Sequence, residues 1–493
     1  MSKTKKYNAI VMGGGIGGLT IACRLSFFKK VLLLEKNPVL GGYCRTFERN
    51  GYKFESAIHA INNCKKGSFI YNILRECHVV NKIKFIQPTN LYRAVYPDHD
   101  IVLPQNNLNK CIEILEGLFP QETKGIKGLF AEIDKIHTEV ERINRQKKLL
   151  RSPSIVKATE ISLQYLLDKY IINPKLKSII AQYWVYCGLP PSKLSPVHFS
   201  YIAEDYMMNG SFCIENGTQA LIDALEERIT KNKSLIMKMC EVTDIIVDDG
   251  RAVGVITADG KKYYADCLIS SMDARYTFER LTEKNNDVKI CLKQMQQTLP
   301  SISSVRVYLG LNKDCQELGI NDYEVFLNSD YDIDKNFDAM VKNDVSNISF
   351  GLCIHSNIDR SVCKKGHSVV TITMLAGYDY WTALNSRDYK EKKTKIANAL
   401  ITKAEQIIPN LRKYIDVMVV ASPMTMKRYT GNVKGAAFGW SRNVFFYGSR
   451  HMNIQTPVKN LYLTSNWTKI GGGVEGVIRS ADRAFDLIMG KKK

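Results

Sequence analysis

Residues 7–20 read Tyr-Asn-Ala-Ile-Val-Met-Gly-Gly-Gly-Ile-Gly-Gly-Leu-Thr, and residues 31–35 read Val-Leu-Leu-Leu-Glu. The apolar run at 9–12 is typical of a buried strand, and the apolar spacing from Leu19 to Leu25 predicts an amphipathic helix. The run at 31–34 predicts a second buried strand. Strand, glycine-rich turn, helix, strand and terminal acid in this order predict a dinucleotide-binding unit.

The glycines of this unit have the spacing G-x-G-x-x-G. Gly13 allows the tight turn, Gly15 lets the backbone approach a pyrophosphate, and Gly18 lets the helix pack on the strand. The helix N-terminus offers free N–H groups to the phosphates, and Glu35 stands where a carboxylate would hold ribose hydroxyls. The cofactor-binding residues predicted here are Gly13, Gly15, Ile16, Gly17, Gly18, Glu35 and Lys36.

The composition indicates a large, basic protein. A chain of 493 residues suggests two or three domains, and 69 Lys and Arg against 49 Asp and Glu give a formal net charge of +20. A positive charge of this size favours binding to nucleic acid or to anionic lipid; the alternative is that it only keeps the protein soluble. Because no nucleic-acid-binding module is visible, we expect no nucleic acid and favour an anionic membrane surface. The basic segment 145–157, interleaved with apolar residues, is the predicted membrane contact, and a solvated helix and loop is the alternative.

Cysteine usage and hydropathy indicate the compartment. The 13 cysteines are scattered without a C-x-x-C pair, which fits reduced thiols in the cytosol. The dinucleotide-binding unit begins by residue 9, which leaves no room for a signal peptide, and no run approaches the roughly 20 apolar residues of a spanning helix. We therefore expect a cytoplasmic protein that at most lies on a membrane.

A second glycine cluster, Gly-Gly-Gly-Val-Glu-Gly at 471–476, follows a predicted strand at 460–464 and precedes a helix through residue 488. It would aim N–H groups and a helix dipole at an anionic or electron-rich group, and a flavin ring fits because its reduced form carries negative charge. A flexible turn is the alternative. Two such sites at opposite chain ends can hold one extended cofactor, with adenosine and pyrophosphate at the first and the ring at the second.

Further strands and helices are predicted between these two sites. The Asn50-Gly51 pair predicts a hairpin, residues 105–210 are mostly helical, and 240–270 form a meander bracketed by Asp-Gly turns. Strands of a further sheet are predicted at 302–311, 347–355 and 368–375.

Taken together, these motifs resemble the phytoene desaturase, carotenoid isomerase and retinol saturase group, FAD-dependent oxidoreductases of the amine-oxidase superfamily. The resemblance runs nearly end to end, and the stretch from Gly41 to His59 looks most like retinol saturase. The segments that carry it are 13–18, Glu35, Gly41-Gly42, 54–59, 240–260, 423–429, 435–439, 460–468 and 471–480. Two segments depart from the group: Ser465-Asn466 replaces the usual Gly-Asp, and residues 213–217 replace Tyr-Pro-x-Gly-Gly.

The resemblance implies an α/β fold with a discontinuous, glutathione-reductase-like FAD-binding domain of Rossmann type and an α+β substrate domain. The FAD-binding domain is expected to comprise 1–75, 212–300 and 415–493. The substrate domain, with possible membrane-contact helices, is expected to comprise 76–211 and 301–414. The further FAD-binding residues implied are Gly41, Gly42, Arg45, His59, Val242, Asn466, Gly472, Gly473 and Val474.

The activity implied is desaturation, saturation or cis–trans isomerisation of carbon–carbon bonds in a lipophilic polyene or isoprenoid, such as a carotenoid or retinoid. His59 is the catalytic candidate because its loop should reach the flavin, and a buried histidine satisfied by backbone is the alternative. Glu475 is expected to be a surface acid that compensates the helix dipole. No metal site is expected. NAD(P)H, a quinone and O2 remain open as electron partners, because only one dinucleotide fingerprint is present.

Two other classes share features of this chain. A flavin amine oxidase would usually show an aromatic cage and a flavin-facing lysine, and neither is assignable. A prenyl-binding protein of the GDP dissociation inhibitor type shares the fold without FAD, whereas Glu35 and the two glycine clusters favour retained flavin.

Overall fold

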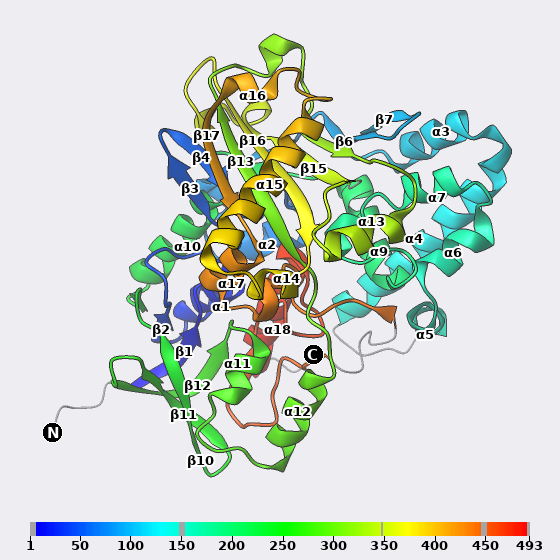
Figure 1. The fold of residues 1–493 in the computed structure, drawn as a ribbon. Coiled ribbons are helices and arrows are strands. Elements are labelled where there is room, and N and C mark those ends of the chain that lie inside the picture. The colour runs from blue at the N-terminus through cyan, green and yellow to red at the C-terminus, as the bar shows by residue number, and fades with distance from the viewer. Residues whose placement is uncertain (1–5, 147–152, 347–348, 445–450, 491–493) are drawn as a thin grey trace.

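Two seven-stranded sheets organise the chain, one in the lower and one in the upper half of Figure 1. The computed structural model describes residues 6–146, 153–346, 349–444 and 451–490. The predicted segment 145–157 therefore lies partly outside the described residues. The α/β fold class predicted from the sequence is confirmed.

The first sheet has the order β10-β11-β12-β1-β2-β9, and β18 pairs with β12. Strands β18, β12, β1, β2 and β9 run parallel, so the carboxyl ends of four central strands open at one edge. The strands are β1 (Lys6–Met12), β2 (Val31–Leu34), β9 (Leu235–Met237), β10 (Val242–Asp248), β11 (Arg251–Thr257), β12 (Lys262–Ser270) and β18 (Leu461–Leu463).

Helices bury this sheet on both faces. Helix α1 (Ile16–Ser26) packs against α18 (Gly473–Ile488) and α10 (Gln219–Lys231), and all of its residues are buried. Strand β2 is buried throughout because both faces are covered. The other helices near this sheet are α2 (Phe69–Glu76), α11 (Ala274–Glu279) and α12 (Asn286–Gln296).

The second sheet has the order β17-β13-β16-β15-β14-β6-β7 and is antiparallel except for the pair of β14 and β6. Its strands are β6 (Asn90–Val95), β7 (Asp100–Pro104), β13 (Ser303–Leu311), β14 (Glu324–Leu327), β15 (Phe350–Ile354), β16 (Ser368–Ala376) and β17 (Ile415–Ala421). The domain division stays a prediction, and β17 lies in this sheet although 415–493 was assigned to the FAD-binding domain.

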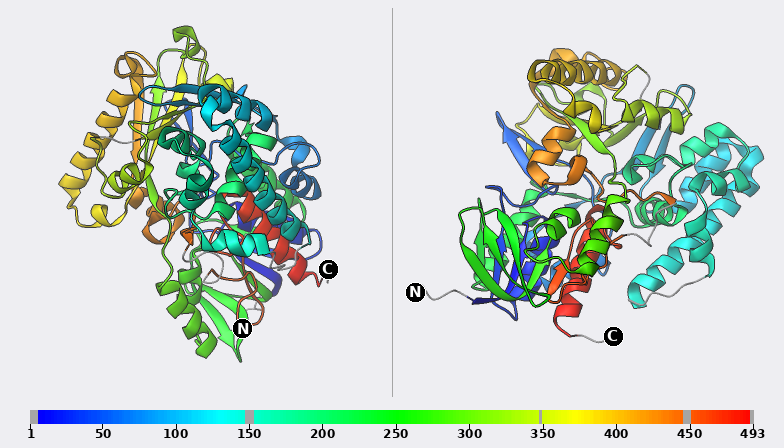
Figure 2. Two further views of the ribbon diagram at one scale, coloured as in Figure 1. Left: turned by 90° about the vertical axis from the view of Figure 1, so that its right-hand side faces the viewer. Right: turned by 60° about the horizontal axis from the view of Figure 1, so that its bottom comes forward.

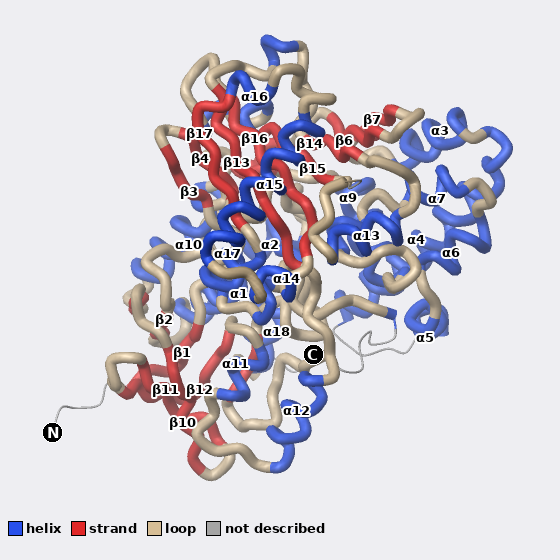
Figure 3. Tube along the Cα trace, viewed as in Figure 1, coloured by secondary structure: helices blue, strands red, loops and turns tan. Residues whose placement is uncertain are grey.

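Helix α15 (Ser386–Ala404) crosses the outer face of the second sheet in Figure 1. A group of helices from residues 108–209 lies beside this sheet, in cyan and green in Figure 2 and in blue at the right of Figure 3. Its members are α3 (Leu108–Leu118), α4 (Thr123–Gln146), α5 (Pro153–Glu160), α6 (Leu163–Tyr170), α7 (Pro174–Ile180), α8 (Trp184–Cys187) and α9 (Pro196–Asn209). Within the described ranges, no helix combines the length and apolarity needed to cross a membrane.

Short elements complete the fold. Strands β3 (Thr46–Arg49) and β4 (Tyr52–Glu55) form the predicted hairpin, whose turn residues Asn50 and Gly51 both have positive φ. The remaining elements are β5 (Phe85–Ile86), β8 (Cys213–Ile214), α13 (Ile333–Val341), α14 (Asp379–Thr382), α16 (Leu411–Tyr414) and α17 (Pro423–Thr430), with 3₁₀ turns at Val80–Lys82, Pro120–Glu122, Gln316–Leu318, His355–Asn357, Arg360–Val362 and Val433–Gly435.

Candidate active site: two adjoining cavities

A cavity of about 540 Å³ opens at the carboxyl edge of the first sheet. The loops that follow four parallel strands reach it: Gly13 after β1, Glu35 after β2, Ser271 after β12 and Ser465 after β18. Ligands of open α/β sheets bind at this edge because the strand ends and helix N-termini converge there. The fold therefore assembles one site from chain segments that are far apart in the sequence.

The turn from β1 to α1 is shaped by its glycines. Gly13 has φ +96°, and a Cβ on Gly18 would lie 2.0 Å from the Gly13 carbonyl oxygen, so α1 can pack this closely only on a glycine. A Cβ on Gly15 would instead point into open space, with Ser271 Oγ at 4.0 Å as its nearest neighbour. Gly15 is also the N-cap of α1, and no side chain caps the helix.

Glu35 is held in place at the end of β2. Its Oε2 accepts a hydrogen bond from the Gly14 N–H at 2.7 Å, and its Oε1 accepts one from the Asn37 N–H at 2.8 Å. Oε1 also accepts a hydrogen bond from the side-chain amide of Asn37 at 2.7 Å. The carboxylate is buried and lines the cavity, so these three donors fix it while Oε2 can still accept from a ligand.

The start of α18 is the second helix N-terminus at this site. Gly472, at φ +132°, is its N-cap, and no side chain caps it. Gly473 and Val474 line the cavity, and a Cβ on Gly473 would meet no atom within 4 Å. A Cβ on Gly17 would lie 2.8 Å from Val477, so α1 and α18 are in close contact where they begin. Two uncapped helix starts thus present N–H groups to one cavity.

A second cavity, of about 170 Å³, adjoins the first. It lies between the inner face of the second sheet, helices α8 and α9, and the loop after β4, and most of its wall is apolar. The residues that line both cavities are Tyr43, Ile58, Ala437, Gly473 and Val474. The two spaces are therefore separated by little more than this shared wall.

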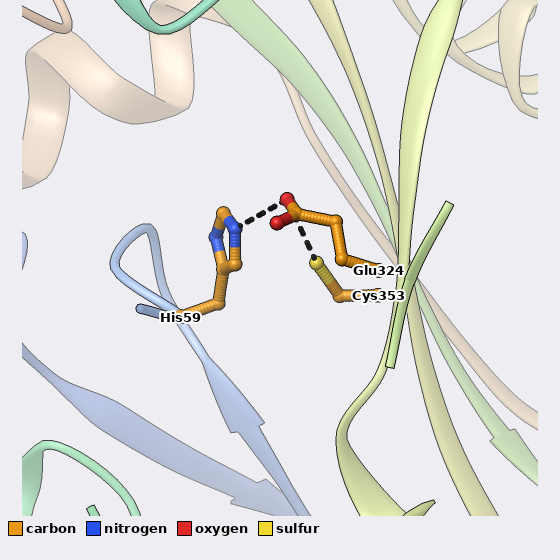
Figure 4. Close-up of side chains that lie close together, drawn as sticks. All are labelled: His59, Glu324 and Cys353. Carbon is orange, nitrogen blue, oxygen red and sulfur yellow. Dashed lines mark hydrogen bonds and ion pairs between the residues drawn. The ribbon is translucent and has the colours of Figure 1, made fainter. Parts of the chain in front are cut away.

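Polar side chains gather at one place in the second cavity (Figure 4). His59 Nε2 lies 2.8 Å from the Tyr186 hydroxyl and 2.9 Å from Glu324 Oε1, and Tyr186 also donates to Glu324. The Cys353 thiol, opposite Glu324 in the sheet, contacts the same oxygen at 3.9 Å. Burial and the nearby Glu324 raise the pKa of Cys353 well above its usual range.

This cluster can hold and transfer a proton. Glu324 is only 5% exposed and accepts hydrogen bonds, whereas His59 and Tyr186 can each donate. Ligand atoms of His59, Glu324 and Cys353 also lie within 4.8 Å of one another, a spacing compatible with a metal ion. The neighbouring His355 is neutral, because burial lowers its pKa to about 3.

The structure brings most of the predicted site residues together. Those that line the first cavity are Gly13, Gly15, Ile16, Gly17, Glu35, Lys36, Gly41, Gly42, Val242, Asn466, Gly473 and Val474. His59 and Gly472 line the second cavity instead. Gly18 packs against Gly13 within the turn. The guanidinium carbon of Arg45 lies 5.0 Å from the ring centre of Tyr429, and Tyr429 lines the first cavity.

One expectation about the site is wrong. Glu475 is 2% exposed, not a surface acid: it forms an ion pair with Arg479 at 2.6 Å and accepts hydrogen bonds from Asn62 and Asn63. The amides and guanidinium replace the water that a surface carboxylate would have.

Two groups of residues that line the first cavity were not predicted from the sequence. The first group, 271–273, follows β12, and its position at the end of a strand parallel to β1 is a signal that could have revealed it. The second group, 427–432, ends α17 and contributes Lys427 and Arg428. Part of this segment carries the resemblance, but no chemical motif marks it as a cavity wall.

Comparisons with known proteins agree with this architecture. The sequence model described as flavin containing amine oxidoreductase matches residues 16–489. Prolycopene isomerase 1 of an Oncidium hybrid cultivar is 26% identical, over all of this chain and 86% of that protein, and rat all-trans-retinol 13,14-reductase is 22% identical, over 93% and 82%. An oxidoreductase structure from Methanosarcina mazei has a TM-score of 0.69 at 18% identity, covering 98% of this chain and 100% of that one.

Proposed function

The chain belongs to the flavin containing amine oxidoreductase family, and from this premise we propose that it is an FAD-dependent enzyme acting on carbon–carbon double bonds of a lipophilic polyene or isoprenoid. The reaction class is desaturation, saturation or cis–trans isomerisation. The observation that carries the proposal is the mainly apolar second cavity, which shares a wall with the glycine-lined first one. The names of two relatives, for prolycopene and for all-trans-retinol, support a carotenoid or retinoid.

The residues of the first cavity fit FAD. The open space above Gly15 and the uncapped start of α1 suit a pyrophosphate, which accepts hydrogen bonds from backbone N–H groups. Glu35, held by the Gly14 N–H and by the N–H and side-chain amide of Asn37, suits ribose hydroxyls. The uncapped start of α18, with open space at Gly473, suits the electron-rich end of the ring. Bound FAD would supply hydride acceptance and donation.

The chain's own residues position the substrate and supply the proton. Apolar side chains of the second cavity, such as Phe326 and Phe350, would exclude water from a polyene. Addition of hydrogen to a double bond needs one proton for each hydride, and isomerisation through a cation needs a proton that is added and then removed. Tyr186, His59 and Glu324 hold such a proton at the cavity wall.

The test begins with the purified protein. We expect bound flavin in its absorbance spectrum, and turnover of all-trans-retinol or prolycopene by the reduced protein, followed by chromatography of the products. NAD(P)H, a quinone and O2 should be compared as electron partners, and lipids that co-purify should be identified. A colourless protein would favour the prenyl-binding class, and peroxide released from amines without polyene turnover would favour an amine oxidase.

We also propose that the protein contacts anionic membranes, which a net charge of +20 and a lipophilic substrate favour. Flotation with anionic liposomes should recover the wild type. Charge reversal across 145–157 should reduce the recovery, and unchanged flotation of that variant would contradict a contact through this segment.

A further inference from the structure

Arg306 of β13 is a cation in the wall of the mainly apolar second cavity. Its Nε is buried and has no hydrogen-bond partner. Two more deeply buried arginines are paired with acids: Arg24 forms ion pairs with Glu76 and Asp482, and Arg479 forms ion pairs with Glu475 and Glu141. Within the described residues, no carboxylate lies within ion-pair distance of Arg306, so its charge is unmatched where hydration is limited.

The register of the sheet directs Arg306 to the cavity. Arg306 pairs with Thr373 of β16, Thr373 with Gly351 of β15, and Gly351 with Phe326 of β14. Directly opposite residues share a face of a sheet, and all four line the second cavity. Gly351 has no side chain, and the ring of Phe326 lies 3.5 Å from where its Cβ would be, so the row has an apolar side at Phe326 and a cationic end at Arg306.

The acids of the cavity already have partners. Glu324 accepts hydrogen bonds within the polar cluster of His59 and Tyr186. Glu475, on the opposite wall, is paired with Arg479. Each of these carboxylates is stabilised by its own donors, so neither takes Arg306 as an ion-pair partner. An anionic ligand would supply the counter-charge that the cavity lacks.

We propose that Arg306 binds the carboxylate of an amphipathic substrate, which makes the substrate class of this enzyme a long unsaturated acid, and not a hydrocarbon. This inference rests on the proposed function. A guanidinium presents paired N–H donors that match a carboxylate, and a single cation matches a single negative charge. The apolar chain of the acid would extend along Phe326, Met340, Phe350 and Leu375.

The experiment compares two ligands with the same polyene chain, all-trans-retinol and all-trans-retinoic acid. Their affinities for the flavin-loaded protein are measured by calorimetry at a pH where the acid is ionised. We expect the wild type to bind the acid at least tenfold more tightly than the alcohol, which corresponds to about 1.4 kcal/mol. Arg306→Gln should remove this preference while affinity for the alcohol changes less than about twofold, and Arg306→Lys should retain part of it.

Controls separate this inference from the proposed function. Arg387→Gln, which removes a cation that is 86% exposed on α15, should behave as the wild type does. Equal affinity for the two retinoids, or a preference that survives in Arg306→Gln, would overturn the role of Arg306 and leave the proposed polyene chemistry standing. Palmitate provides the opposite test: if it bound through Arg306 and neither retinoid bound, the carboxylate site would stand and the polyene would be wrong.

Discussion

The chemistry available to the His59 side chain depends on the residues that surround it. Its position in a loop after β4 made it a candidate, but its chemistry comes from Glu324, which is 265 residues away in the sequence and 2.9 Å away in space. The imidazole forms hydrogen bonds with the side chains of Tyr186 and Glu324. The alternative considered from the sequence was a buried histidine with hydrogen bonds to the backbone. His59, Tyr186 and Glu324 together form a group in which a proton can reside on any of the three side chains.

Glu324→Gln tests that group. Glutamine keeps the size of the side chain but cannot carry the negative charge that would stabilise a protonated His59. Because positioned acid–base groups contribute on the order of 10²–10⁴-fold to rates, we expect single-turnover conversion of the polyene to fall at least about a hundredfold. Flavin content and polyene affinity should stay at wild-type values.

The matched control for this variant is Cys353→Ser, since Cys353 touches the same carboxylate only through a weak 3.9 Å contact. It should retain most of the activity. The proton role would be wrong if Glu324→Gln converted substrate at the wild-type rate. One zinc ion per chain, lost in both variants, would identify the cluster as a metal site.

Residues differ in how far the sequence reveals them. Gly13, Gly15 and Glu35 are predictable because their spacing is local and each has a known part in one turn. Glu324 and Arg306 are not, because nothing in their own strands marks them, and only the pairing of β13 to β16, β15 and β14 places them in one cavity.

At the scale of elements, two glycines of the β1–α1 turn are expected to have different roles, Gly15 in binding a ligand and Gly18 in packing the helix on the strand. Gly15→Val would place its side chain in open cavity space at a backbone φ of −71°, which any residue adopts. We expect flavin affinity to fall at least tenfold, or about 1.4 kcal/mol. The thermal stability of the flavin-free protein should be nearly unchanged.

Gly18→Ala is the matched contrast. Its Cβ would lie 2.0 Å from the Gly13 carbonyl oxygen, so α1 must move away from β1. Overpacking of this kind costs about 1–3 kcal/mol, and it should lower the melting temperature of the flavin-free form. If Gly15→Val melted lower than Gly18→Ala, the turn would be explained by packing and not by a ligand.

Elements with strong patterns were predictable, and short ones were not. Strand β2 has the predicted bounds, and strands β13 and β16 each differ from theirs by one residue at one end, because runs of apolar residues mark them. Strands β9 and β14 were not predicted, because β9 has only three residues and the charged Glu324 leaves β14 an apolar run of three. Their positions depend on the neighbours with which they pair.

At the scale of the whole molecule, a buried cluster joins the helical group to the first sheet. Asp205 of α9 and Glu475 of α18 share the amide donors of Asn62 and Asn63, from the loop after β4. Three segments from distant parts of the chain thus meet at two carboxyl groups. Asp205 is 2% exposed, and burial, together with the charge of Glu475, raises its pKa to about 8.

This pKa makes the stability of the molecule depend on pH. An unfolded aspartate titrates near 3.9, so between about pH 4 and pH 8 the folded protein binds a proton that the unfolded chain releases. The stabilising contribution is complete below pH 4 and is lost as pH rises to 8, by at most about 1.4 kcal/mol per pH unit. The nearby His137 acts in the opposite direction at lower pH: burial lowers its pKa, so below the usual pKa of histidine the unfolded chain binds a proton that the folded ring does not. The pH dependence of Asp205 is therefore measured as a difference from a variant that keeps His137.

Asp205→Asn should remove this dependence, because an amide resembles the protonated carboxyl and does not ionise. We expect the melting temperature of the variant, relative to that of the wild type, to increase from pH 5 to about pH 8 and to level off above it. Asp338→Asn, which alters a carboxyl that is 64% exposed, should show no such trend. A constant difference between Asp205→Asn and the wild type would mean that Asp205 is ionised throughout, and that the amide donors of Asn62 and Asn63, with Arg479, suffice to hold two charged carboxylates at this junction.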